Sequence, residues 1–250
     1  MLAIVIVGAL LTAVGSVWLA SRILSRDTRP EHNSVLSPFL TVVALIYGVL
    51  LGFTVVVGWQ QFLSAEVNVS DEASTLTTLY RQTVAIPQPE QSQLREQLRK
   101  YAGALQGPEW GKHEFSSIGN AGRAALTEMY RIVGGPQPND ASNPINQDFL
   151  SQLTTLASDR SRRILDSEPR MPPLLWSSLI FGGIVLIVLT SFLRLESKRG
   201  HVILVSAVTV LLGLLLYLVF ELDHPFGPMG VTPQPFVHAV TVFDSVDSGT

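Results

Sequence analysis

The stretch FLTVVALIYGVLLGFTVVVGWQQFL, residues 39–63, contains no acidic or basic side chain. An α-helix rises about 1.5 Å per residue, so about 20 apolar residues span the hydrocarbon core of a bilayer. Three further uncharged stretches reach this length, at residues 2–21, 174–193 and 202–220. The four stretches form two close pairs, one toward each end of the chain. The sequence therefore predicts an all-α membrane protein with four transmembrane helices in two hairpins.

The composition agrees with this assignment. Of the 250 residues, 47% are hydrophobic and 15% are charged, whereas soluble domains carry about 25% charged residues. The net charge of -3 provides no basic surface for nucleic acid. The chain has no cysteine, which excludes disulfides, thiolate metal sites and a Cys nucleophile.

The first span could be a membrane anchor or a cleaved signal peptide. No Lys or Arg precedes it, and Arg22 and Arg26 follow it directly. A signal peptide has the opposite order of charge, so we expect an anchor that inserts with its N-terminus outside the cytoplasm.

The charges of the two short loops predict an orientation. Both loops must lie on the same side of the membrane, and both are basic: Arg22, Arg26 and Arg29 in one, Arg194, Lys198 and Arg199 in the other. The positive-inside rule places them in the cytoplasm and puts both termini and the middle segment outside. Four arginines approach the third span from the other side, but long loops are exempt from the rule: Arg160, Arg162, Arg163 and Arg170.

Helical periodicity continues beyond the second span. An apolar stripe at three- and four-residue spacing follows residue 63, formed by Ala65, Val69, Ala73, Leu76, Leu79 and Tyr80. We therefore expect the second span to project from the membrane as one long helix that ends before Pro87. Pro38 should open the second span and Pro172-Pro173 the third.

Further helices are expected outside the membrane, at residues 90–105, 117–133 and 145–168, with a Pro-, Asn- and Asp-rich loop before Pro144. A short amphipathic helix is expected in the tail at residues 233–243, followed by fraying Ser-Gly-rich residues. The predicted organisation is a membrane hairpin at 1–63, a helical extramembrane domain at 64–172, a second hairpin at 173–221 and an extramembrane tail at 222–250.

The sequence contains no catalytic signature such as HExxH, GxSxG or GxxxxGK[ST]. The five histidines do not pair at ligand spacing on one helix: His32, His113, His201, His224 and His238. We therefore expect no enzyme activity and no cofactor, while a metal site stays open.

Acidic residues follow the second and fourth spans, and the topology places both groups on the same side of the membrane. They are Glu66, Asp71, Glu72, Glu221 and Asp223. Carboxylates gathered at a membrane mouth concentrate cations. The alternative is that these acids are solvated helix ends, or partners of Arg81 and of the basic run 160–163. The turn motif His224, Pro225, Phe226 and Gly227 is expected to end the fourth helix.

Small and hydroxyl residues mark the second span: Thr41, Gly48, Gly52, Thr54 and Gly58. They, like Gly182-Gly183 in the third span, would allow close helix packing. In the second span they could instead line a pore with an uncharged neck.

These residues resemble the bestrophin-like domain family of membrane proteins found in bacteria and plants. The resemblance rests on Gly52-Phe53, on the segments 66–73 and 75–81, and on Leu222-Asp223-His224-Pro225-Phe226-Gly227 with Pro233-Gln-Pro-Phe236. It implies a relation to bestrophins, which are pentameric anion channels whose middle and terminal regions lie in the cytosol. That orientation is opposite to the one predicted from the loop arginines, and anion selectivity is opposite to what an acidic mouth favours.

Two functions are therefore predicted. The first is a homo-oligomeric ion channel in the bacterial inner membrane, with the second span nearest the axis, acidic residues at one mouth, and lipid and inorganic ions as its other partners. The second is a non-conducting receptor or scaffold whose helical extramembrane domain binds a partner or ligand.

Overall fold

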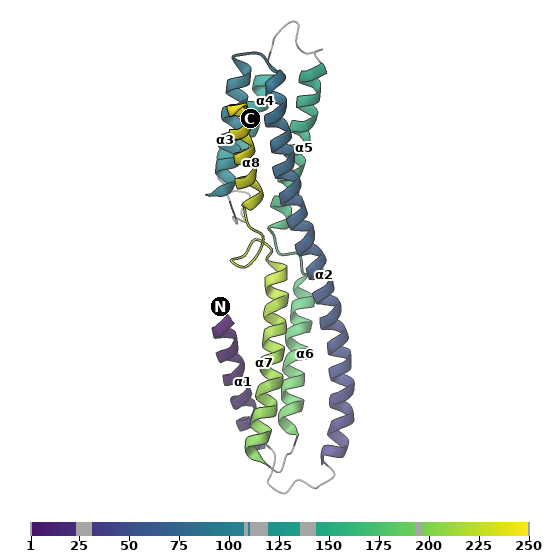
Figure 1. Ribbon diagram of the computed structural model, residues 1–250. Helices are drawn as coiled ribbons and strands as arrows, with labels where there is room; N and C mark the ends of the chain where they lie inside the picture. Colours follow the sequence, from purple (N-terminus) through teal and green to yellow (C-terminus); the bar gives the residue numbers. More distant parts are fainter. Residues whose placement is uncertain are drawn as a thin grey trace. The chain divides into compact units, whose positions relative to one another are not determined.

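The computed structural model describes residues 2–23, 32–107, 110, 120–135, 144–193 and 197–249. Within these ranges the chain forms eight α-helices, one short 3-10 helix and no strand (Figure 1). The α-helices are α1 (Leu2–Ile23), α2 (His32–Gln82), α3 (Glu90–Gln106), α4 (Asn120–Val133), α5 (Pro144–Asp166), α6 (Pro173–Phe192), α7 (Lys198–Asp223) and α8 (Gln234–Ser248). The predicted all-α class is confirmed.

The chain divides into two compact units. The first comprises Met1–Gln60 and Arg170–Asp223, and the second comprises Gln61–Pro169 and His224–Thr250. Helix α2 contributes its N-terminal part to the first unit and its C-terminal part to the second.

The first unit contains the four helices that are long and apolar enough to cross a membrane: α1, α6, α7 and the N-terminal part of α2. Within this unit α1 packs along α7 and also contacts α6, which in turn packs along α7 (Figure 1). Large apolar side chains cover the outer surfaces of these helices, including Phe181 on α6 and Ile203 on α7. Such surfaces suit helices surrounded by lipid, and the four predicted spans are confirmed as candidate membrane helices.

The helix starts differ from the prediction at one proline. Helix α6 begins at Pro173 with Pro172 as its N-cap, as expected. Helix α2 begins at His32, so the predicted start at Pro38 is wrong, because the proline lies inside the helix. The polar residues before Pro38 extend the helix, and the Thr41 hydroxyl donates a hydrogen bond to the carbonyl oxygen of Ser37 at 2.9 Å.

The second unit packs α3, α4, α5, α8 and the C-terminal part of α2 around an apolar core. The predicted stripe on α2 forms part of this core, and Ala65, Val69, Leu76 and Leu79 have no exposed surface. Helix α2 is continuous as expected, and it ends before Pro87 through a 3-10 turn, η1 (Thr83–Ala85).

The tail helix is longer than predicted. Helix α8 continues beyond Phe243 to Ser248 and ends at Gly249, whose φ of 71° is left-handed. The carboxylates of Asp244 and Asp247 are bound by arginines of α3, which holds the added part of the helix, while fraying of the final residues stays a prediction.

Several predicted features lie outside the described residues. These are the loop arginines Arg26, Arg29 and Arg194, residues 117–119 of the third extramembrane helix, and the loop at 136–143.

Candidate functional site

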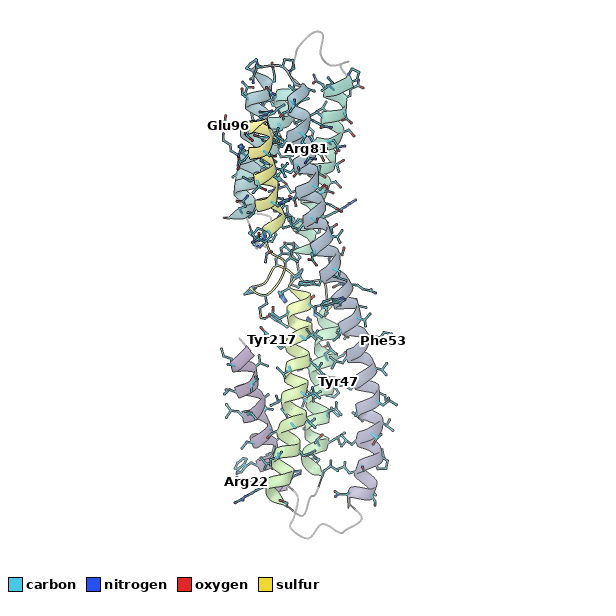
Figure 2. All side chains as sticks on the ribbon, in the orientation of Figure 1. Arg22, Tyr47, Phe53, Arg81, Glu96 and Tyr217 are labelled. Carbon is cyan, nitrogen blue, oxygen red and sulfur yellow. The ribbon has the colours of Figure 1, made fainter. Side chains whose placement is uncertain are left out.

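The structure divides the predicted residues of the second span between two faces of α2. Thr41, Gly48 and Gly52 are exposed, whereas Thr54 and Gly58 are buried. Figure 2 shows Tyr47 directed toward α6 and Phe53 on the outer side of α2. The five residues therefore do not form a single lining.

The two buried residues make packing contacts. A Cβ added at Gly58 would lie 3.2 Å from both the Leu222 Cβ and the Met171 Cε, so the glycine permits close contact there. The Thr54 hydroxyl donates to the Leu50 carbonyl oxygen of its own helix at 2.8 Å. By contrast, a Cβ at Gly48 or Gly52 would have no neighbour within 4 Å.

The acids that follow the second span also differ in environment. Glu66 and Asp71 are exposed, whereas Glu72 is fully buried. The Glu72 carboxylate accepts hydrogen bonds from the Arg163 Nε at 2.6 Å and from the Tyr101 hydroxyl at 2.5 Å. Glu72 thus has the contact that the alternative interpretation expected, an ion pair with the basic run on α5.

Buried polar side chains surround this pair. Burial and the charge of Glu72 raise the pKa of Tyr101 well above its ordinary value, and the Arg160 guanidinium lies 5.7 Å from the Tyr101 ring centroid. Two further hydrogen bonds join α2 to α5, from Asn68 Nδ2 to Asp166 Oδ2 at 2.6 Å and from Thr75 Oγ1 to Asp159 Oδ2 at 3.0 Å.

Sequence reasoning offered the Glu72–Arg163 pair only as an alternative and missed the two flanking hydrogen bonds of this polar seam, although a signal was present. On α2 the seam residues Asn68, Glu72 and Thr75 are spaced by four and three residues. On α5 their respective partners are Asp166, Arg163 and Asp159, which are spaced by three and four residues. The residue numbers fall on α5 as they rise on α2, so the two helices run in opposite directions. Residues at such spacing share one helix face, so the pattern predicts two antiparallel helices with matching polar faces.

The acids that follow the fourth span belong to the first unit. Asp223 ends α7 and is buried, and its Oδ1 accepts hydrogen bonds from the backbone N–H groups of Arg170 and Met171 at 3.0 Å each. Its Oδ2 accepts from the Trp176 Nε1 at 3.0 Å. Glu221 is half-buried and hydrogen-bonded to the Tyr217 hydroxyl. Glu66, Asp71 and Glu72 lie in the second unit, so a meeting of the two acidic groups stays a prediction.

The residues after Asp223 form a hydrogen-bonded turn. The Gly227 N–H donates to the His224 carbonyl at 2.9 Å, and the Val231 N–H donates to the Pro225 carbonyl at 2.7 Å. Gly230 is required here, because an added Cβ would lie 2.0 Å from the Pro225 carbonyl oxygen. Phe226 is buried with its ring edge-on to Trp110, at 5.4 Å between centroids.

A second charged cluster holds α8 in the second unit. Asp247 pairs with Arg95 and Arg99 at 2.7 Å each and accepts a hydrogen bond from the Tyr80 hydroxyl at 2.7 Å. The Tyr80 and Phe243 rings stack at 4.0 Å. Burial acts to raise the pKa of Asp247, but the hydrogen bonds from Tyr80 and Arg99 and the two arginine charges outweigh it and lower the pKa.

No group of three or more His, Asp and Glu side chains is arranged to hold a metal ion among the residues that the structure describes.

The helical architecture, with four long apolar spans and a lipid-compatible outer surface, defines an integral membrane protein. The chain belongs to the bestrophin-like domain family, whose model matches residues 7–236. No curated protein sequence matches the chain.

Solved structures share the fold. Two crystal structures of variants of a bacterial bestrophin homologue from Klebsiella pneumoniae align with TM-scores of 0.69 and 0.71, at 14% and 13% identity. The first alignment covers 98% of both chains, and the second covers 100% of this chain and 99% of the other. A crystal structure described as a membrane protein gives a TM-score of 0.72 at 14% identity, covering 99% of this chain and 98% of that chain.

Proposed function

We propose that several copies of this chain assemble into an ion channel in which the exposed face of α2 lines the path. The observation that carries the proposal is the exposed, uncharged face with Thr41, Gly48 and Gly52, where a Cβ at either glycine has open space around it. Small residues allow helices of other copies to approach closely in lipid. Membership in the bestrophin-like family supports the same function.

Exposure selects the acids that are candidates for the mouth. Glu66 is exposed, as is Asp71, whereas the carboxylates of Glu72 and Asp223 are buried in internal contacts. Repeated in each copy, Glu66 would form a ring of carboxylates that concentrates cations.

The test is ion flux through purified protein in liposomes, together with the mass of the particle. We expect a ring of four or more copies and a reversal potential that favours cations. Glu66→Gln combined with Asp71→Asn should shift the reversal potential toward anions. Flux with an unchanged reversal potential would refute the acidic mouth, and a monomeric particle would refute the channel.

A non-conducting receptor or scaffold is the second candidate. It is favoured by a groove of about 580 Å³ between α3 and α4, which is lined mainly by small residues and flanked by Lys100 and Glu128. This function predicts monomers or dimers without ion flux, so the same two measurements discriminate it from a channel.

The loop arginines favour an orientation with the short loops in the cytoplasm and the termini and middle domain outside. We therefore propose that residues 64–172 and the tail at 222–250 form extramembrane regions on the outer side, with the hairpins at 1–63 and 173–221 in the bilayer. Bestrophins have the opposite orientation, with cytosolic middle and terminal regions. Labelling of Gly103→Cys from outside intact cells decides between the two.

A further inference from the structure

Tyr47 is the aromatic contact between α2 and α6. Its side chain is buried, with 5% of its surface exposed, and its ring lies directly on the backbone of α6 at Gly182. The Tyr47 hydroxyl donates a hydrogen bond to the Leu179 carbonyl oxygen at 3.1 Å. Figure 2 shows the side chain pointing from α2 toward α6.

The ring fits because residue 182 is a glycine. A Cβ added there would lie 2.5 Å from the Tyr47 Cδ2 and 2.8 Å from its Cε2, closer than packed side chains allow. A Cβ at Gly183 would also approach the Tyr47 hydroxyl oxygen, at 3.3 Å. Together the two glycines form a slot for the ring. The glycine pair of the third span therefore has a specific packing role, which is to make room for Tyr47.

The contact of Tyr47 with α6 constrains the rotation of α2 about its own axis as well as the distance between the two helices. The aliphatic neighbours of this core, such as Leu40, Val43 and Leu51, make contacts without directional preference. By contrast, the packing of the Tyr47 ring in its slot and the hydrogen bond from its hydroxyl to the Leu179 carbonyl both depend on orientation. A hydroxyl surrounded by hydrocarbon also needs a hydrogen-bond partner. Rotation of α2 about its axis would remove the ring from the slot and break the hydrogen bond.

We propose that Tyr47 is a positioning residue that sets the rotation of α2 and thereby the face that the helix presents away from α6. Successive residues are offset by about 100° around an α-helix, so the seat of Tyr47 also fixes the directions of Gly48 and Gly52. The consequence for conduction rests on the proposed channel function, while the seating of the helix does not.

The experiment uses single cysteines, since the natural chain has none. Gly52→Cys and Phe53→Cys are labelled separately in the reconstituted full chain with a water-soluble maleimide, and the ratio of the two rates reports the rotation of α2. Both positions are exposed in the protomer. The ratio and the Tm are compared in the unmodified background and with Gly182→Ala, Tyr47→Ala or both. Gly15→Ala is the control, because a Cβ at Gly15 has no neighbour within 4 Å.

We expect Gly182→Ala to change the labelling ratio several-fold and to lower the Tm, while Gly15→Ala changes neither. In the Tyr47→Ala background, Gly182→Ala should have no further effect, because the slot acts through the ring. Tyr47→Phe, which keeps the ring, should largely keep the ratio. Equal effects of Gly182→Ala with and without Tyr47, or a ratio that stays constant in every variant, would overturn the proposal.

The outcomes separate this inference from the channel itself. Equal labelling at positions 52 and 53 in the unmodified background would contradict the pore-lining face, yet a ratio that depends on Tyr47 and Gly182 would still support the seating. If Gly182→Ala alone does not fold, recovery of folded protein on adding Tyr47→Ala supports the slot, and failure to recover overturns it.

Discussion

Replacing Glu72 by Gln should destabilise the second unit strongly. The variant removes the charge that faces Arg163 at 2.6 Å, where the two side chains are 0% and 7% exposed. Loss of one partner from a buried ion pair costs about 3–5 kcal/mol. The Gln amide oxygen can still accept the Tyr101 hydrogen bond, so we expect the lower end, about 3 kcal/mol. At roughly 2–4 °C per kcal/mol for a chain of this size, the Tm should fall by roughly 6–12 °C.

The measurement is thermal unfolding in detergent, with Glu66→Gln as the matched control. Glu66 lies on the same helix and is exposed, so its neutralisation should change stability by less than about 0.5 kcal/mol. Adding Arg163→Met to Glu72→Gln should recover part of the loss, because the buried Arg163 charge that has lost its carboxylate partner is then removed as well. If Glu72→Gln unfolds at the same temperature as Glu66→Gln, the buried pair does not stabilise the unit and this reasoning is wrong.

Three further predictions follow from other contacts. Asp223→Asn should cost about 1.5–3 kcal/mol in unfolding experiments, because a neutral amide replaces the charged acceptor of three hydrogen bonds; an unaffected Tm would contradict the role of Asp223 in holding the start of α6. Because the pKa of Asp247 lies below the ordinary 3.8, the docking of α8 should hold at pH above that value and weaken as the pH falls through the lowered pKa. Hydrogen exchange of α8 should show this loss of protection in acid. An Asp247→Asn variant that keeps the same acid transition would exclude Asp247 as its cause. A Gly103→Cys variant, at an exposed position with no neighbour within 4 Å of a Cβ, should be labelled from outside intact cells if the loop arginines set the orientation, and protected if the middle domain is cytosolic.

The membrane spans could be predicted from sequence because their signal is local. An uncharged stretch of about 20 residues needs no partner to be recognised, and the stripe from Ala65 to Tyr80 carries its own helical period. The start of α2 could not be predicted in this way, since polar residues ahead of Pro38 continue the helix. The length of α8 depends on Arg95 and Arg99, which lie far away in the sequence.

The environments of the acidic residues could not be predicted from composition alone. Glu66 and Glu72 are both acids on one helix, and only the packing of α5 buries one of them against Arg163 while the other stays exposed. The same holds for the small residues of the second span. Gly58 faces Leu222 and Met171, whereas Gly48 and Gly52 face away from the protomer. The four-three spacing of polar residues on α2, with its complement on α5, was the available signal for the buried pair.

The most direct test of the proposed channel is ion flux through liposomes containing Gly52→Leu, compared with Gly15→Leu. Both positions are exposed, a Cβ at either has no neighbour within 4 Å, and leucine favours helix over glycine, so both variants should fold. If the exposed face of α2 lines the path, Gly52→Leu narrows it and flux falls sharply, whereas Gly15→Leu on α1 leaves flux unchanged. Equal flux through the two variants and the unmodified protein would contradict the assignment of α2 as the pore helix.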